Sequence, residues 1–265
     1  MTTIMVTGAT DGLGLAAAQR LAGQGHRLVL HGRDEARLDR AAAAVADVRD
    51  DAGAGTVHAD LSDLDDVGRL ADAAAGLGLD VLVNNAGVLR TGHAPADGLD
   101  VRFVVNTIAP YLLTRRLLGS LPDHGRVVNL SSAAQAPVDL DALAGRARLD
   151  DDMAAYAQSK LALTMWSRHV ADEIGPDGPA VIALNPGSLL ATKMVKEGFG
   201  IAGHDIAVGA DVIARAAVGD DFAGATGRYY DNDAKRFAPP HADAADATRN
   251  AALVQVLDDL LARLG

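Results

Sequence analysis

Short runs of β-branched and aliphatic residues alternate along this chain with alanine-rich segments of helical periodicity. The runs lack the strict alternation of apolar and polar residues that marks a strand with one wet face, so they fit parallel strands buried on both faces. Right-handed crossovers between such strands build a doubly wound sheet. The expected strands are 4–7, 28–30, 56–58, 81–83, 126–130, 180–184 and 227–231. We therefore predict an α/β protein with a parallel sheet of about seven strands and helices on both faces.

The helical segments complete this pattern, and the natural strand order is that of a Rossmann sheet. Expected helices cover 12–23, 34–48, 63–76, 98–120, 152–175, 205–218 and 245–264. No break in composition suggests a linker, so we expect residues 1–265 to form a single Rossmann-type domain. Two segments interrupt the rhythm: a substrate-side insertion at 135–151 and a substrate loop at 188–204. Both should border the active site, because ligands bind beyond the carboxyl ends of such strands.

The charge and composition exclude several functions. A net charge of −11 opposes non-specific attraction to nucleic acid or an anionic membrane. The chain has no cysteine, which rules out thiol nucleophiles and cysteine-ligated metals. His93, His169, His204 and His241 show no ligand spacing, and we expect no metal site. No apolar run reaches about 18 residues and the N-terminus does not resemble a signal peptide, so a cytoplasmic location is expected.

A glycine-rich turn, Thr7-Gly8-Ala-Thr10-Asp-Gly12-Leu13-Gly14, lies between the first expected strand and helix. It leaves backbone N–H groups free at a helix N-terminus, an arrangement that attracts a pyrophosphate. A tight turn with close helix packing also requires glycine, so the motif alone leaves ligand binding open.

The end of the second strand bears on the choice of cofactor. An NAD site usually has an acidic residue here for the ribose 2′-hydroxyl, whereas this chain has Gly32 followed by Arg33. The cation favours NADP(H). NAD(H) remains possible, because Asp34 and Glu35 adjoin Arg33 and the arginine could be a solvated residue at a helix start.

Two further strand ends carry candidate cofactor contacts. Asp60, followed by Leu61, could accept a hydrogen bond from the adenine amino group, or it could cap the next helix in competition with Ser62. In Asn84-Asn85-Ala86-Gly87, the small residues would let a ribose approach, and Asn84 could tie neighbouring strands together. A generic turn would look similar.

A tyrosine and a lysine stand four positions apart in Tyr156-Ala-Gln-Ser-Lys160, within a predicted helix. Their Cβ atoms should lie about 5–6 Å apart. The ammonium would then depress the phenol pKa from about 10 and make Tyr156 a usable acid near neutral pH. Ser132, after an apolar run, would hold the substrate oxygen. Taken singly, the pair could be a helix surface pair, and Ser131 and Ser132 could cap a turn.

The motifs Thr7-Gly-x-x-x-Gly-x-Gly14, Asp60-Leu61, Asn84-Asn-Ala-Gly87, Asn106, Ser132, Tyr156-x-x-x-Lys160 and Pro186-Gly187 occur in this order over nearly the whole chain. The set resembles the short-chain dehydrogenase/reductase family in its short single-domain form. The resemblance implies a catalytic tetrad of Asn106, Ser132, Tyr156 and Lys160, and alignment from Arg126 favours Ser132 over Ser131. It also implies that Pro186, Gly187, Ser188 and Leu189 lie beside a nicotinamide, with Thr192 near its carboxamide.

The chain departs from the common family pattern at two places. Thr192 stands one position later than usual, and the interval between Ser132 and Tyr156 is long. The long interval resembles that of retinol-dehydrogenase-like and NADP-dependent carbonyl reductase members. The family often pairs the helices expected at 98–120 and 152–175, which makes a homo-dimer or homo-tetramer possible, although the insertion before Tyr156 could obstruct that surface.

The resemblance implies hydride transfer between NADP(H) and a small-molecule carbonyl or alcohol substrate. Tyr156 would protonate the carbonyl oxygen and Ser132 would position it. Lys160 would depress the pKa of Tyr156 and bind the nicotinamide ribose, and Asn106 would anchor a water. A hydrophobic aldehyde or ketone is favoured by the residues expected near the pocket: Leu89, Met153, Leu189, Leu190, Met194 and Phe199.

Other functions remain open from the sequence. The chain could be an NAD-dependent alcohol dehydrogenase or a biosynthetic ketoreductase. It could also be a dinucleotide-binding redox sensor without turnover, although the intact Ser132, Tyr156 and Lys160 argue against that reading.

Overall fold

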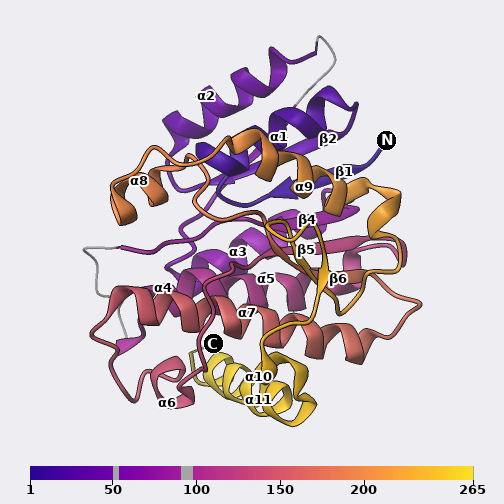
Figure 1. The fold of residues 1–265 in the computed structure, drawn as a ribbon. Coiled ribbons are helices and arrows are strands. Elements are labelled where there is room, and N and C mark those ends of the chain that lie inside the picture. Colours follow the sequence, from indigo (N-terminus) through magenta and orange to yellow (C-terminus); the bar gives the residue numbers. More distant parts are fainter. Residues whose placement is uncertain (50–53, 91–97, 265) are drawn as a thin grey trace.

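The computed structural model describes residues 1–49, 54–90 and 98–264, with only the backbone described at 197–199. These residues form an eight-stranded sheet in the order β3-β2-β1-β4-β5-β6-β7-β8 (Figure 1). The first seven strands are parallel. The strands are β1 (Thr3–Val6), β2 (Arg27–Gly32), β3 (Ala54–His58), β4 (Val81–Asn84), β5 (Arg126–Leu130), β6 (Ala180–Asn185), β7 (Tyr229–Asp231) and β8 (Arg236–Ala238). The predicted α/β class and doubly wound sheet are confirmed.

The eighth strand was not predicted from the sequence. β8 pairs antiparallel with β7, with Tyr230 opposite Phe237. It is only three residues long and lies just before Pro239-Pro240, so its sequence carries no strand pattern of its own. Aromatic packing holds β8 in place, because the Phe237 ring lies 5.1 Å from the ring of Tyr230 and 5.2 Å from that of Phe222.

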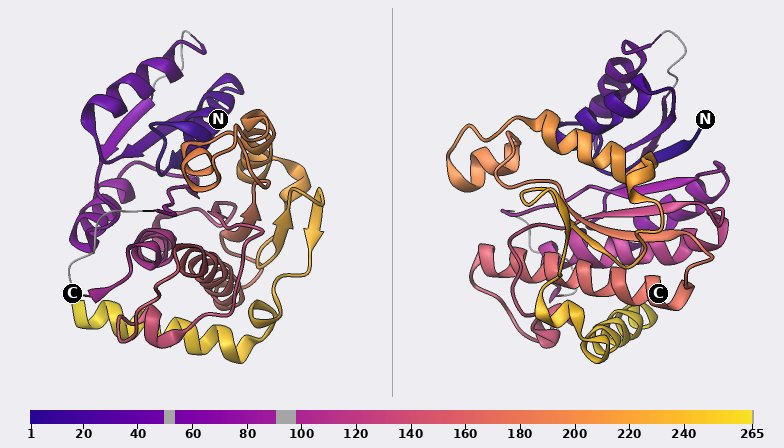
Figure 2. Two further views of the ribbon diagram at one scale, coloured as in Figure 1. Left: turned by 60° about the vertical axis from the view of Figure 1, so that its left-hand side comes forward. Right: turned by 45° about the vertical axis from the view of Figure 1, so that its right-hand side comes forward.

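Helices cover both faces of the sheet, as Figures 1 and 2 show. One face carries α1 (Gly12–Gly23), α2 (Glu35–Ala46) and α9 (Ile206–Val218), which bury alanine and leucine side chains against the sheet. The other face carries α3 (Leu64–Ala75), α5 (Ala109–Leu117) and α7 (Asp152–Ile174). Aspartates cap several of these helices, as expected where a side-chain oxygen satisfies free N–H groups.

The single helix predicted at 98–120 is broken into four pieces. After α4 (Val101–Phe103) the backbone widens into a π-helical turn, η2 (Val104–Ile108), before α5 and a final 3-10 turn, η3 (Leu118–Ser120). Apolar periodicity does not distinguish an α-helix from a π-turn inside it. π-turns of this kind are frequent at functional sites.

A C-terminal pair of helices, α10 (Ala242–Ala245) and α11 (Ala247–Leu264), lies outside α7 in both figures. α11 buries Leu253, Leu257 and Leu260, and Tyr111 of α5 donates a 2.7 Å hydrogen bond to Asp258. Helices α5 and α7, which the family resemblance nominates for subunit contacts, are therefore covered in part by the same chain.

The two segments that interrupt the α/β rhythm contain short helices. The insertion at 135–151 holds α6 (Leu140–Leu143), and the loop at 188–204 holds α8 (Lys193–Phe199). A last 3-10 turn, η4 (Asp220–Phe222), precedes β7. In the described part of the chain, no helix combines the length and the apolar character needed to cross a bilayer.

Candidate active site

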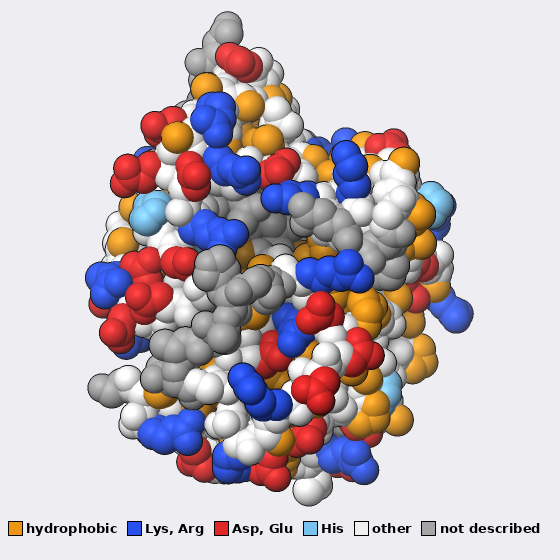
Figure 3. Space-filling view, turned by 90° about the vertical axis from the view of Figure 1, so that its left-hand side faces the viewer, with side chains coloured by type: hydrophobic (Ala, Val, Ile, Leu, Met, Phe, Trp, Pro, Cys, Tyr) orange, Lys and Arg blue, Asp and Glu red, His pale blue; other side chains and the backbone are white. Residues whose placement is uncertain are grey.

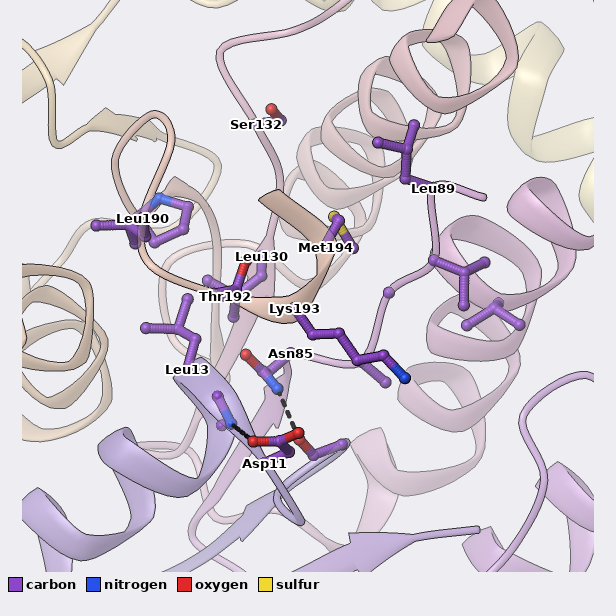
Figure 4. Close-up of a pocket in the computed structure, with 18 of the residues that line it drawn as sticks. Asp11, Leu13, Asn85, Leu89, Leu130, Ser132, Leu190, Thr192, Lys193 and Met194 are labelled. Atoms are coloured by element: carbon purple, nitrogen blue, oxygen red, sulfur yellow. Dashed lines mark hydrogen bonds between the residues drawn. The ribbon is translucent and has the colours of Figure 1, made fainter. Parts of the chain in front are cut away.

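A cavity of about 630 Å³ opens at the carboxyl ends of the strands, where the order turns at β1 and β4. Such a switch point is where ligands bind in doubly wound sheets. Every residue that the sequence nominates for the cofactor lines this cavity, together with Ser132, Tyr156 and Lys160. Of the four residues of the implied tetrad, Asn106 does not line it. Figure 4 shows its two ends: Asp11 and Asn85 lie at one, Ser132 and Leu89 at the other.

The glycine turn needs its glycines because neighbouring backbone lies too close for a side chain. A Cβ atom at Gly14 would lie 2.3 Å from the Gly8 carbonyl oxygen and 2.5 Å from Asn85 Nδ2. Gly8 and Gly12 adopt φ values of 63° and 53°, which favour glycine. Asn85 Nδ2 donates to the Gly8 carbonyl at 3.2 Å and so ties the turn to the end of β4.

Asp11 and His31 also line the cavity, although the sequence analysis did not nominate them. Asp11 caps α1 by accepting from the Gly12 N–H at 2.7 Å, and the pattern of an aspartate before a helix could have identified it. His31 accepts from the Gly8 N–H at 3.2 Å through Nδ1, and its Nε2 lies 3.1 Å from the Ala59 carbonyl oxygen. These bonds require the neutral tautomer with its proton on Nε2. Burial lowers the pKa of His31 to about 4, in keeping with that form.

The end of the cavity near β2 is basic. Arg33 lines it, and Arg37, one turn into α2, lines it too. Asp34 beside Arg33 is already engaged, because it caps α2 by accepting from the Arg37 N–H at 2.9 Å. Lysine and arginine side chains surround the recess in Figure 3, and Lys193 of α8 also lines the cavity.

Asp60 lies beyond the end of β3 and lines the cavity; its predicted bond to an adenine remains untested. Its Oδ1 accepts from the Ser62 hydroxyl at 2.7 Å and from the Ser62 N–H at 2.9 Å. The alternative that Asp60 or Ser62 caps α3 is wrong, because Asp63 accepts from the N–H groups of the first turn.

At the opposite end, Tyr156 and Ser132 line the cavity together, close enough for the Ser132 side chain to lower the pKa of Tyr156. Burial raises the pKa of Tyr156, and the Ser132 contact offsets this only in part. The expected net depression of this pKa is therefore wrong for the structure, because burial has the larger effect. The lysine Nζ lies 5.8 Å from the centre of the tyrosine ring and donates instead to the Leu130 carbonyl oxygen at 2.7 Å. Burial lowers the pKa of Lys160 to about 8.

The two neighbouring serines have different partners. Ser131 is buried and shares a 2.8 Å hydrogen bond with Thr164. Its hydroxyl also donates to the Lys160 carbonyl, so both partners belong to α7. Ser132 faces Tyr156. Its carbonyl oxygen accepts from Tyr229 at 3.1 Å and from Gln135 at 2.9 Å, which fixes the backbone of the β5 end from two sides.

Asn106 lies behind the cavity wall, in the π-turn η2, with 1% of its surface exposed. Its amide accepts from the Val88 N–H at 2.8 Å and donates to the Val88 carbonyl and the Ser159 hydroxyl, both at 2.9 Å. A Cβ atom at Gly87 would lie 3.3 Å from Asn106 Oδ1 and 3.4 Å from Lys160 Nζ. The described bonds of Asn106 hold the strand end after β4 against α7. The anchored water remains an expectation.

The 186–189 loop follows β6 and lines the cavity with Pro186, Gly187, Ser188 and Leu189. Thr192 lines it as well, and its hydroxyl caps α8 by accepting from the Val195 N–H at 3.3 Å. Asn84 performs the predicted tie between strands, donating to Asn129 Oδ1 at 2.8 Å.

These residues fit a dinucleotide better than any metal. Backbone at the glycine turn and the small Gly87 leave room where side chains would intrude, and cations lie at the end nearest β2. Within the described ranges, no group of three histidine, aspartate or glutamate side chains is arranged to hold a metal ion.

Comparison with known proteins agrees with this geometry. The family model described as short chain dehydrogenase matches residues 2–199. Retinol dehydrogenase 13 of Homo sapiens is 30% identical over 273 residues, covering 93% of this chain and 81% of that protein.

Two solved structures share the fold. An uncharacterized protein from Mycobacterium paratuberculosis superposes with a TM-score of 0.81 at 29% identity, covering 98% of this chain and 93% of that one. A short chain dehydrogenase from Burkholderia cenocepacia J2315 in complex with NADP gives a TM-score of 0.70 at 28% identity, covering 87% of this chain and 95% of that one.

Proposed function

The chain belongs to the short-chain dehydrogenase/reductase family, and on that premise we propose that it reduces the carbonyl group of hydrophobic aldehydes or ketones with NADPH. Family membership makes it an NAD(P)-dependent oxidoreductase acting on CH–OH or C=O groups. The observation that carries the proposal is that Tyr156 and Ser132 lie close together in the same cavity as the glycine turn.

The paired hydroxyls of Tyr156 and Ser132 suit a carbonyl oxygen that gains negative charge. When bound, the nicotinamide cofactor supplies the hydride. Ser132 donates a hydrogen bond to the oxygen, and Tyr156 donates the proton that completes the alcohol. Because burial keeps the pKa of Tyr156 high, the phenol carries its proton at neutral pH, and it can donate that proton where nearby positive charge stabilises the phenolate.

Lys160 supports this acid from within the cavity. Its ammonium lies 5.8 Å from the Tyr156 ring centre, where positive charge stabilises the phenolate that forms as the proton leaves. The same ammonium faces Gly87, the small residue beside which a ribose would lie.

The basic end of the cavity supports NADP(H) over NAD(H). Arg33 and Arg37 provide guanidinium groups for a 2′-phosphate. A Cβ atom at Gly32 would lie 2.4 Å from the Thr10 side chain, so this position does not readily accept the acidic residue typical of NAD sites. A related structure is described as a complex with NADP.

An apolar wall supports a hydrophobic substrate. Leu89, Met153, Leu190 and Met194 line the same cavity as Tyr156. The exposed Leu189 adds apolar surface at the same loop, while Phe199 lies outside the residues whose side chains are described. The name of the human relative, a retinol dehydrogenase, is consistent with this substrate class.

The proposal is tested by following NADPH and NADH oxidation against a panel of aliphatic and aromatic aldehydes, ketones and quinones. We expect turnover with NADPH, and a loss of about 10²–10⁴-fold in kcat in Tyr156→Phe with NADPH binding retained. Tyr111→Phe is the matched control, because it removes a buried hydroxyl that contacts α11 instead of the cavity. NADPH binding without turnover by the unmodified protein would favour a redox sensor, and near-native turnover in Tyr156→Phe would reject the proposed acid.

A further inference from the structure

The 186–189 loop has a backbone shape that it does not hold easily by itself. Gly187 has φ of 121°, and Leu189 has φ of 54° although it carries a branched side chain. A non-glycine residue is strained in this region and persists where its surroundings hold it. The loop therefore needs contacts with another part of the chain.

Asp233, in the turn between β7 and β8, provides those contacts. Its Oδ1 accepts from the Ser188 N–H at 2.9 Å, and its Oδ2 accepts from the Ser188 hydroxyl at 2.5 Å. Oδ2 also accepts from Asn185 Nδ2 at 3.0 Å. One carboxylate thus binds the end of β6 and the middle of the loop together.

The two residues before Asp233 extend the same attachment. Asn232 donates from Nδ2 to the Pro186 carbonyl at 2.9 Å and from its N–H to the Asn185 carbonyl at 3.1 Å. Asp231 accepts from Asn185 Nδ2 and from the Asp233 N–H. Antiparallel pairing of β7 with β8 fixes the turn from which these side chains reach the loop.

We propose that Asp233 is a positioning residue for the nicotinamide half of the cofactor, acting through the hydrogen bonds that hold Ser188 and Asn185. The inference rests on the proposed function, because the 186–189 loop is the part assigned to the nicotinamide. Asp233 does not line the cavity, so it acts on the ring through the loop alone.

The ionisation of Asp233 agrees with this role. Burial raises its pKa, but the hydrogen bonds from Ser188 and Asn185 outweigh burial and hold the pKa below its usual range. The group stays a carboxylate, the form that accepts all three bonds.

The test compares two ligands, NADP⁺ and adenosine 2′,5′-bisphosphate, which keeps the 2′-phosphate end and lacks the nicotinamide. Binding of each is measured by calorimetry for the unmodified protein, Asp233→Ala, Asp233→Asn and the control Asp177→Ala. Asp177 is an exposed carboxylate in the turn before β6, at the opposite ends of the strands. We expect Asp233→Ala to weaken NADP⁺ about tenfold and to change the bisphosphate by less than about twofold.

The NADP⁺ affinity of Asp233→Asn should lie between that of the unmodified protein and that of Asp233→Ala, because asparagine keeps one acceptor oxygen and loses the charge. The kcat for carbonyl reduction should be lower in Asp233→Asn than in the unmodified protein, and lower still in Asp233→Ala. A loosely held nicotinamide ring is less often aligned for hydride transfer. Ser188→Ala removes one partner, and its loss should not add to that of Asp233→Ala in the double variant.

Three results would overturn the inference. They are an equal loss for both ligands, no loss for NADP⁺, or fully additive effects of Asp233→Ala and Ser188→Ala. Failure of the proposed function is a separate outcome, because the unmodified protein would then bind neither ligand or would bind NADP⁺ without turnover.

Discussion

Lys160 donates a 2.7 Å hydrogen bond from its ammonium to the carbonyl oxygen of Leu130, the last residue of β5. The bond ties α7 to the end of β5, immediately before Ser131 and Ser132 in the sequence. The ammonium lies 5.8 Å from the centre of the Tyr156 ring, so its influence on Tyr156 is exerted through space. The charge state of Lys160 therefore matters more for this chemistry than a direct contact does.

The pH dependence of reduction should report that charge. Burial lowers the pKa of Lys160 to about 8, so the group is protonated below this pH and loses its proton above it. We expect kcat/KM with NADPH to fall as pH rises through about 8. Lys160→Arg keeps its charge to higher pH, so whatever activity it retains should lack this limb. A flat profile up to pH 9 in the unmodified protein, or the same limb in Lys160→Arg, would contradict the assignment.

Cofactor choice should depend on Arg33. A charge-assisted hydrogen bond contributes about 1.5–3 kcal/mol, so Arg33→Ala should weaken NADPH binding by roughly 10–100-fold and leave NADH little changed. Arg37→Ala should act in the same direction. Arg40→Ala is the control, because it lies on α2 without lining the cavity. Fluorescence titration with both cofactors measures the difference, and equal losses for NADPH and NADH would remove the 2′-phosphate assignment.

Acid should destabilise the fold through His31. Its pKa in the folded protein, about 4, lies below the value of 6.5 expected in the unfolded chain. The unfolded chain thus binds the proton first, so the stability from this neutral histidine is complete above pH 6.5 and is lost as pH falls towards 4. The effect amounts to about 3 kcal/mol at most.

Urea unfolding at several pH values measures this effect. His31→Gln does not titrate, so its free energy of unfolding should fall less steeply between pH 6.5 and 4 than that of the unmodified protein. Parallel curves for the two proteins would show that His31 does not carry the acid sensitivity.

The glycine turn should tolerate no side chain at Gly14. The added methyl group of Gly14→Ala would lie 2.3 Å from the Gly8 carbonyl oxygen, so the turn must open and its N–H groups must move. We expect cofactor affinity to fall more than tenfold, together with a lower Tm. Gly119→Ala is the matched control, since nothing lies within 4 Å of its added atom. Unchanged NADPH affinity in Gly14→Ala would show that the turn does not hold the pyrophosphate.

The class of the fold was predictable from the sequence because each central strand carries its own apolar run. β4 and β5 are buried along most of their length, and their runs are visible without any partner. β8 and η2 were not predictable for a different reason. The former depends on aromatic packing against β7, and the latter is a local widening of a helix whose apolar pattern stays helical.

Within the site, features that depend on residues close together in the sequence were predictable, and features that depend on distant contacts were not. The spacing of Tyr156 and Lys160 along one helix placed both in the cavity, but their pKa values depend on burial and on Leu130, which spacing does not reveal. Asp233 lies far from Ser188 in the sequence, and no local pattern links them. The roles proposed for the nominated residues remain predictions to be tested by the variants described.

The position of α11 has a consequence for synthesis on the ribosome. A chain emerges at about 5–20 residues per second, so α7, with Tyr156 and Lys160 on it, is complete several seconds before α11 appears. Until then its outer apolar surface lacks the covering that Leu253 and Leu257 later provide. The nascent protein consequently passes through an interval in which α7 has been synthesised but its outer apolar surface is still exposed. Chaperone binding would be most useful during that interval.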